Sequence, residues 1–187
     1  SSALVGRRPT DEWRWATLEG ARVIPVGFTP VPWMSLRSAL VRKGVALERV
    51  ALVDVSTVEG AIDLFLRNQA DYIHLPNPQA QQLIEEGHGY LATAVGPSLG
   101  YLCYSSFAVA PSYLAENCET VERFVMGFHR ALEWVDNASA KEIAAMVASF
   151  FPEIPRPVLE ASVQRYKDQQ TWPTGPLIGE DGFAEMR

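Results

Sequence analysis

Between residues 20 and 96 the chain alternates three times between short apolar runs and amphipathic stretches. The apolar runs have the length of strands, and the amphipathic stretches repeat apolar residues at helical spacing. Strands are expected at 23–27, 50–55, 72–75 and 90–95, with helices between them. This alternation is typical of parallel strands joined by right-handed crossovers. The sequence therefore predicts an α/β lobe built on a mostly parallel sheet.

Three details refine this prediction. Pro25 removes a backbone donor, so its strand is expected either at a sheet edge or with Pro25 at its end. The run at 50–55 has the apolar density of a buried strand. A further short strand near Leu4 leads into Arg7 and Arg8, which are expected to form a solvated linker surface.

After residue 96 the alternation stops. The apolar run at 101–110 is predicted to be one long strand, and amphipathic helices follow it. A capping box at Ser139 opens a helix that is expected to bury Met146 and Phe150. These apolar faces need a partner surface. The helices therefore either cap the 20–96 sheet or belong to a second lobe whose other strands are absent, as in a mature or truncated form.

Composition narrows the function classes. The chain has 16 basic and 22 acidic residues, a net charge of −6, which argues against nucleic-acid binding. No apolar run approaches the roughly 20 residues that span a bilayer. The cysteines and histidines match no metal-ligand, catalytic or cofactor motif, so no catalytic residue, metal or cofactor is expected. Cys103 and Cys118 are expected to be free thiols, although a disulfide between them stays open.

Five segments carry a family resemblance. They are Leu-Glu-Gly-Ala-Arg-Val at 18–23, the Gly-x-Thr turn at 27–29, Gln-Ala-Asp-Tyr at 69–72, Pro-Asn-Pro at 76–78 and the long helical stretch at 124–134. Each is weak alone, but their order and spacing are specific. Over essentially its whole length the chain resembles the C-terminal part of ABC-importer substrate-binding proteins, in the branch for sulfonates, taurine and thiamine-pyrimidine precursors. The family usually has an acidic residue before the proline of this motif, and this chain has Asn77 in its place. Recognition of a cationic ligand group at this position is therefore in doubt.

The resemblance implies a two-lobed, periplasmic-binding-protein-like α/β fold. Residues 1–19 would lead into the second lobe, 20–100 would form this ligand-binding lobe, and 101–187 would be a crossover strand and the C-terminal helices of the first lobe. The implied role is capture of a small molecule between lobes that close and dock on a membrane permease. The implied location is periplasmic or extracellular.

In open α/β sheets, ligands bind beyond the carboxyl ends of the strands. Three loops qualify, at 28–34, 74–78 and 97–104, and they offer aromatic walls together with a few polar groups. The candidate ligand-binding residues are Thr29, Trp33, His74, Asn77, Ser98, Tyr101, Tyr104 and Ser105. Pro30 and Pro32 remove amide donors that an anion would need, so a flat heterocyclic or aromatic ligand is favoured over a sulfonate.

Each candidate also has a structural interpretation. Trp33 opens the apolar stripe of a helix and is equally expected in the core. His74 ends an apolar strand, where a histidine is more often structural, and Asn77 lies between prolines that favour a turn. Tyr101 and Tyr104 point to opposite faces of a strand, so at most one lines a cleft. Trp172 is a further aromatic candidate whose position the sequence does not fix.

Two other functions remain open at this stage. One is an enzyme on the same fold, related to pyrimidine-precursor synthesis. Such enzymes are associated with a cysteine-rich iron motif, which the two cysteines of this chain cannot supply. The other is a ligand-sensing domain that works without a transporter.

Overall fold

The computed structural model describes residues 2–9, 11, 13–27, 29–100, 103–180 and 182. Its strands form a sheet in the order β3-β2-β4-β1-β5. The strands are β1 (Ser2–Gly6), β2 (Arg22–Ile24), β3 (Ala51–Leu52), β4 (Tyr72–Pro76) and β5 (Tyr90–Ala94). β2 runs parallel to β3 and β4, whereas β1 runs antiparallel to β4 and β5. Four strands therefore share one direction, which confirms the predicted α/β class with a mostly parallel sheet.

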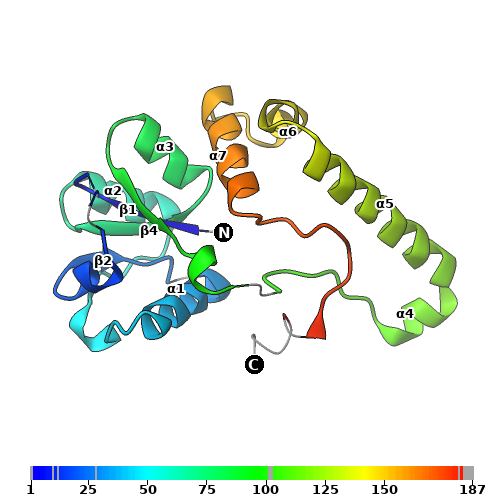
Figure 1. The fold of residues 1–187 in the computed structure, drawn as a ribbon, viewed down its shortest axis with the longest axis horizontal. Helices are drawn as coiled ribbons and strands as arrows, with labels where there is room; N and C mark the ends of the chain where they lie inside the picture. Colours follow the sequence, from blue (N-terminus) through cyan, green and yellow to red (C-terminus); the bar gives the residue numbers. More distant parts are fainter. Residues whose placement is uncertain are drawn as a thin grey trace.

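Helices cover both faces of this sheet (Figure 1). They are α1 (Pro30–Arg42), α2 (Val58–Leu66) and α3 (Gln79–Glu85), with 3₁₀ turns at Trp15–Leu18, Leu47–Arg49 and Gly96–Ser98. Neighbouring residues of a strand face opposite sides, so Leu4 of β1 packs with Leu36 of α1. Val5 packs with Phe65 of α2 on the other face. β1 is thus buried on both faces between β4 and β5.

The residues after β1 are not all linker surface. The Arg7 guanidinium lies 4.3 Å from the centre of the Phe65 ring, and its Nε donates to the Ala70 carbonyl at 2.6 Å. Burial lowers the pKa of Arg7. The expectation of a solvated side chain is wrong for Arg7, because the guanidinium lies over the aromatic core, and right for the exposed Arg8.

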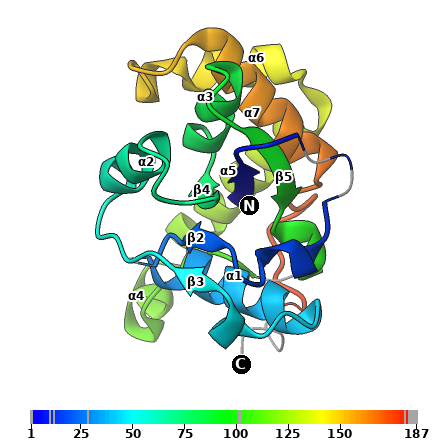
Figure 2. The ribbon, with the colours of Figure 1, turned by 90° about the vertical axis from the view of Figure 1, so that its left-hand side faces the viewer.

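The edge of the sheet differs from the sequence prediction. The run at 50–55 contributes only the two exposed residues of β3, because an edge strand has one neighbour and an open outer side (Figure 2). Pro25 lies directly after β2, which is an interior strand. The alternative that places Pro25 at a strand end is therefore confirmed.

The second part of the chain is helical. It contains α4 (Pro111–Glu116), α5 (Cys118–Asn137), α6 (Ala140–Val147), a 3₁₀ turn (Ala148–Phe150) and α7 (Arg156–Asp168). Figure 1 shows α7 beside α3, with α5 extending along the far side. Residues 103–110, predicted to be a strand, have no regular structure and pair with none of the described strands. The strand prediction is wrong for them, because apolar residues without a neighbouring strand form no ladder.

The predicted capping box at Ser139 is present at the start of α6. Ile143 of α6 packs with Leu159 and Val163 of α7. Met146 and Phe150 were expected in the same core, but they are 65% and 78% exposed. The 3₁₀ turn after α6 ends the helical periodicity, which separates Phe150 from the buried stripe.

Candidate ligand-binding cavity

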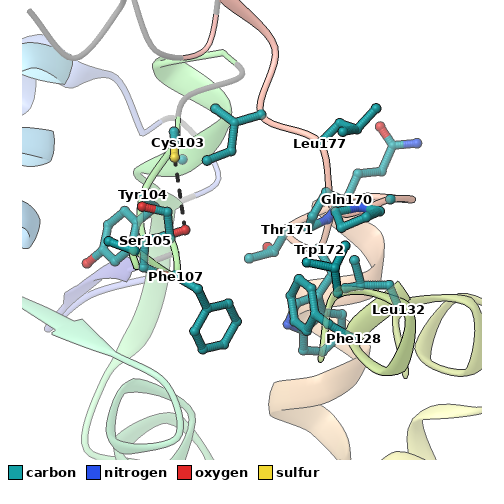
Figure 3. Close-up of a pocket in the computed structure, with 18 of the residues that line it drawn as sticks. Cys103, Tyr104, Ser105, Phe107, Phe128, Leu132, Gln170, Thr171, Trp172 and Leu177 are labelled. Carbon is teal, nitrogen blue, oxygen red and sulfur yellow. Dashed lines mark hydrogen bonds between the residues drawn. The ribbon is translucent and has the colours of Figure 1, made fainter. Parts of the chain in front are cut away.

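A cavity of about 1360 Å³ lies between the sheet and α5. Figure 3 shows Tyr104 on one side of the opening and Leu132 and Trp172 on the other. Small-molecule sites typically occupy roughly 300–1000 Å³. The cavity is therefore larger than a small ligand alone requires.

The α5 end of the cavity is apolar. The Phe107 ring meets the edges of Phe124 and Phe128, with ring centres 4.8 and 5.2 Å apart. Phe107 is nevertheless 69% exposed and Phe124 50% exposed. Val121 and Leu132 extend this apolar wall along α5. Such a surface is typical of a face that packs against protein.

Next to this α5 wall, where α7 stops, the lining is more polar. Gln169, Gln170, Thr171 and Trp172 follow one another along the cavity wall. The Oε1 of Gln169 and the Oγ1 of Thr171 are buried, and neither has a hydrogen-bond partner among the described residues. The Trp172 ring makes an edge contact with Tyr166, with centres 5.5 Å apart. This end combines aromatic surface with polar atoms that lack partners.

The residues that line the cavity favour an uncharged ligand. None of the described residues that line it is acidic, basic or a histidine. Burial raises the pKa of Tyr104. Burial also raises the pKa of Tyr166, although a backbone hydrogen bond from Asn77 opposes this shift. Both phenols therefore stay neutral at pH 7.

Of the seven candidate residues that the structure describes, two line this cavity. Tyr104 and Ser105 lie in its wall, beside the half-buried Cys103, whose Sγ is 4.0 Å from the Ser105 carbonyl (Figure 3). Tyr101 lies outside the described residues. Cys103 and Cys118 are both free thiols.

Three candidates are not among the residues that line the cavity. Thr29 precedes α1, and its Oγ1 donates to the Val26 carbonyl at 3.2 Å. Trp33 packs against the core cluster on the α1 face of the sheet, with the Arg37 guanidinium 5.8 Å from its ring centre. Ser98 lies in the 3₁₀ turn Gly96–Ser98. Their ligand contacts stay predictions.

His74 lies directly behind the wall. It is fully buried on β4, and its Nε2 shares a hydrogen bond of 2.5 Å with the Oγ of Ser2, which lines the cavity. Its Nδ1 has no partner in the described part of the chain. Burial lowers the pKa of His74 to about 3. The His74 imidazole is therefore uncharged at pH 7.

Asn77 lies in the loop between β4 and α3. Its backbone forms a hydrogen bond with Tyr166, which lines the cavity, and its Oδ1 is buried without a partner among the described residues. The neighbouring motif residue Asp71 is structural. It accepts hydrogen bonds from the backbone and guanidinium of Arg22 at 2.9–3.3 Å, which hold its pKa below the usual range.

Sequence reasoning missed the residues at the end of α7. Gln169, Gln170 and Thr171 resemble the solvated end of an amphipathic helix, and only the neighbouring Trp172 drew attention. One signal in the sequence could have drawn attention to them. The turn that ends a helix usually contains a glycine, and no glycine follows α7 directly. The described residues contain no cluster of histidine, cysteine and carboxylate side chains that could hold a metal ion.

The sheet with its one antiparallel strand, and the cavity between it and a helical part, define a periplasmic-binding-protein-like fold. Such folds typically bind ligands between two lobes that close around them. In this structure the sheet and its helices lie on one side of the cavity, and α5 lies on the other. No protein-family model matches the chain.

Relatives of this class are found by sequence and by structure. The chain is 26% identical to the Bacillus subtilis (strain 168) protein named "Putative binding protein YtlA", over 95% of this chain and 53% of that protein. The periplasmic aliphatic sulphonate binding protein SsuA from Escherichia coli superimposes with a TM-score of 0.71 at 16% identity, covering 96% of this chain and 56% of SsuA. The desulfurization enzyme DSZB superimposes with a TM-score of 0.53 at 16% identity, covering 99% of this chain and 66% of the enzyme.

These comparisons confirm the predicted resemblance at the level of the fold. The chain spans about half the length of the B. subtilis relative and of SsuA. A binding protein and an enzyme share the fold, so the fold alone does not assign the activity. Within the described helices, none is both long and apolar enough to cross a membrane.

Proposed function

We propose that the chain is the ligand-binding part of an ABC-importer substrate-binding protein that captures a small molecule between two lobes. The observation that carries this proposal is the cavity, which pairs aromatic walls with a few polar residues and no charged lining residue in the described chain. That combination is typical of reversible small-molecule sites. The names of the B. subtilis relative and of SsuA support a binding role.

A flat heterocyclic or aromatic compound fits this cavity better than a sulfonate. Tyr104 and Trp172 offer ring surfaces for stacking. A sulfonate would need cations or free amides, yet the described wall has no lysine or arginine. The N-terminus of α1 begins with Pro30 and Pro32, which remove amide donors, and none of its first turn lies in the wall.

In this proposal, the helices of 101–187 belong to the first lobe of the two-lobed fold, and the sheet of that lobe covers α5. The cavity exceeds the volume of a small ligand, and the apolar wall with the exposed Phe107 and Phe124 needs a protein partner. The relatives are about twice as long as this chain, which is enough for such a sheet. Ligand would then bind beside the polar residues that follow α7, and the sheet would cover the apolar surface of α5.

The proposed partner is the membrane permease of the importer, and the proposed location is the periplasm or the extracellular surface. Closure of the two lobes around the ligand would create the surface that docks on the permease. Both statements rest on the sulfonate-binding neighbours, of which SsuA is named as periplasmic.

The proposal is tested by titrating the protein with thiamine-pyrimidine precursors and with taurine in a calorimeter. Saturable binding of a pyrimidine, with the compound recovered unchanged by mass spectrometry, supports it. Tight binding of taurine without any response to heterocycles would overturn the ligand class. Chemical conversion of the bound compound would instead identify an enzyme.

A further inference from the structure

The first residue of β1 brings a serine hydroxyl to the sheet side of the cavity. Figure 1 shows the start of β1 on the side of the sheet that faces the helical part. Ser2 lines the cavity and is 6% exposed. Because strand residues alternate between faces, its side chain lies on the same face as Leu4 and as His74, which is opposite Leu4 in β4. Helix α1 covers this face, and its Ser35 lines the same cavity.

The surroundings of His74 decide the direction of its hydrogen bond with Ser2. The Nε2 of His74 lies 2.5 Å from the Ser2 Oγ, and the buried Nδ1 has no partner among the described residues. An uncharged imidazole carries a proton on only one of its nitrogens. A proton on Nδ1 would make a buried N–H group without an acceptor, which is rarer in proteins than an unused acceptor. The proton therefore belongs on Nε2, and His74 donates to Ser2.

This direction leaves the hydroxyl hydrogen of Ser2 available as a donor. A serine hydroxyl has one donor and two acceptor positions, and the Nε2–H of His74 occupies an acceptor position. Within the described residues this hydroxyl makes no other hydrogen bond. Since Ser2 lines the cavity, a molecule that enters the cavity can supply the missing acceptor.

The charge of the wall restricts that acceptor. No described lining residue carries a positive charge, so a carboxylate or sulfonate at this position would lack a counter-charge. An uncharged carbonyl oxygen needs only hydroxyl or amide donors. Ser35 is 8% exposed and offers a second hydroxyl without a hydrogen bond in the described chain. The sheet side of the cavity therefore suits a neutral acceptor.

We propose that Ser2 is a specificity-determining residue whose hydroxyl donates to a carbonyl oxygen of an uncharged ligand, and that His74 is the positioning residue that fixes this donor. The inference rests on the proposed binding function and adds a requirement to it. The ligand carries an acceptor on the side that faces β1, and His74 acts through Ser2 without contacting the ligand.

Nitrogen NMR of the ¹⁵N-labelled full chain tests the donor direction without any ligand. The expected spectrum at pH 7 shows His74 as the Nε2–H tautomer, with an unprotonated Nδ1. His74→Gln removes these signals and thereby assigns them. An Nδ1–H tautomer, or an imidazolium at pH 7, would overturn the proposal, because the Ser2 hydrogen would then be used by His74 or the imidazole would not be neutral.

A matched pair of probes tests the acceptor requirement in a calorimeter. In 2-isopropenylnaphthalene a methylene group replaces the carbonyl oxygen of 2-acetylnaphthalene without a large change of shape. Ser2→Ala should weaken binding of the acetyl compound about fivefold, the effect of one neutral hydrogen bond, and leave binding of the isopropenyl compound nearly unchanged. His74→Leu should also weaken the acetyl compound several-fold. His74→Gln, whose amide can donate to Ser2, should restore most of the wild-type affinity.

Thr120→Val is the matched control, because Thr120 lines the cavity from α5, on the other side from the sheet. It should change neither affinity. Retained binding of the isopropenyl compound shows that a variant still forms the cavity. If circular dichroism shows that Ser2→Ala is unfolded, Ser2→Cys keeps the volume, weakens the donor and should show the same selective loss.

The remaining outcomes separate this inference from the proposed function. An acetyl affinity that Ser2→Ala leaves unchanged, or an equal loss of both probes in a folded variant, overturns the role of Ser2. Binding of thiamine-pyrimidine precursors or taurine without binding of either naphthalene overturns the carbonyl requirement and leaves the proposed function standing. Binding of none of these compounds overturns both.

Discussion

The guanidinium of Arg165 in α7 donates two hydrogen bonds to the Oε1 of Gln81 in α3, at 2.6 and 3.1 Å. Gln81 is 4% exposed, and its Nε2 donates to Glu85 at 2.8 Å. Burial lowers the pKa of Arg165. The contact spans 84 residues of sequence and ties the helical part of the chain to the sheet.

Arg165→Ala should therefore destabilise the protein. It leaves a buried amide oxygen without its charged donor, which typically costs about 1–3 kcal/mol of unfolding free energy. Urea unfolding measures the change. Arg156→Ala, at the exposed start of the same helix, is the control and should change stability by less than about 0.5 kcal/mol. A double-mutant cycle with Gln81→Ala should show coupling of about 1 kcal/mol, and zero coupling would contradict the assigned contact.

Among the described residues, Asn68 and Gln170 are non-glycine residues with a left-handed backbone, and they give a second prediction. Gln170→Gly should stabilise the protein by up to about 1 kcal/mol, because glycine adopts this conformation without steric cost. Asn68→Gly should have a smaller effect, since asparagine already tolerates it. Thermal melting of both variants gives the comparison. A loss of stability in Gln170→Gly would show that the glutamine side chain contributes more than the strain costs.

The apolar wall of α5 gives a third prediction. Phe107 and Phe124 leave aromatic surface open, and exposed patches of this kind bind hydrophobic dyes and promote self-association. The double variant Phe107→Ser/Phe124→Ser should lower the fluorescence of bound 8-anilinonaphthalene-1-sulfonate by about half and reduce self-association in sedimentation experiments. Met34→Ser, an exposed methionine on α1, is the control. Unchanged dye binding in the double variant would place the hydrophobic surface elsewhere.

The sequence predicted the centre of the fold better than its margins. The run at 72–75 becomes β4, which has a neighbour on each side, so its apolar residues and its pairing agree. The equally apolar run at 50–55 lies at the edge and forms only β3. The run at 103–110 lines the cavity and pairs with no strand of the described sheet. Apolar density reports burial, but pairing depends on whether a neighbouring strand is present.

The candidate site shows the same division. Tyr104 and Ser105 could be predicted because they follow a strand–turn pattern on the side where ligands bind. Gln169 and Thr171 could not, because polar residues at a helix end are usually solvated, and only the tertiary structure shows them buried. The sequence favoured equally a ligand-binding role and a core position for Trp33. Its packing with Leu36 and Leu40 agrees with the core position.

The burial of His74 gives a pH-dependent prediction. An unfolded histidine titrates near pH 6.5, whereas the folded His74 has a pKa of about 3. Between these values the unfolded chain binds more protons, so the free energy of unfolding falls as the pH falls. This stability is fully present above about pH 6.5 and is lost toward pH 3, at about 1.4 kcal/mol per pH unit.

His74→Gln removes the titrating group, so its unfolding free energy should depend less steeply on pH between 6 and 4, by roughly that slope. Urea unfolding at several pH values, compared with the wild type, measures the difference. The carboxylates of Asp71 and Glu142, whose pKa values are also lowered, titrate in both proteins and cancel. Parallel curves for wild type and His74→Gln would mean that His74 is accessible to protons in the folded protein.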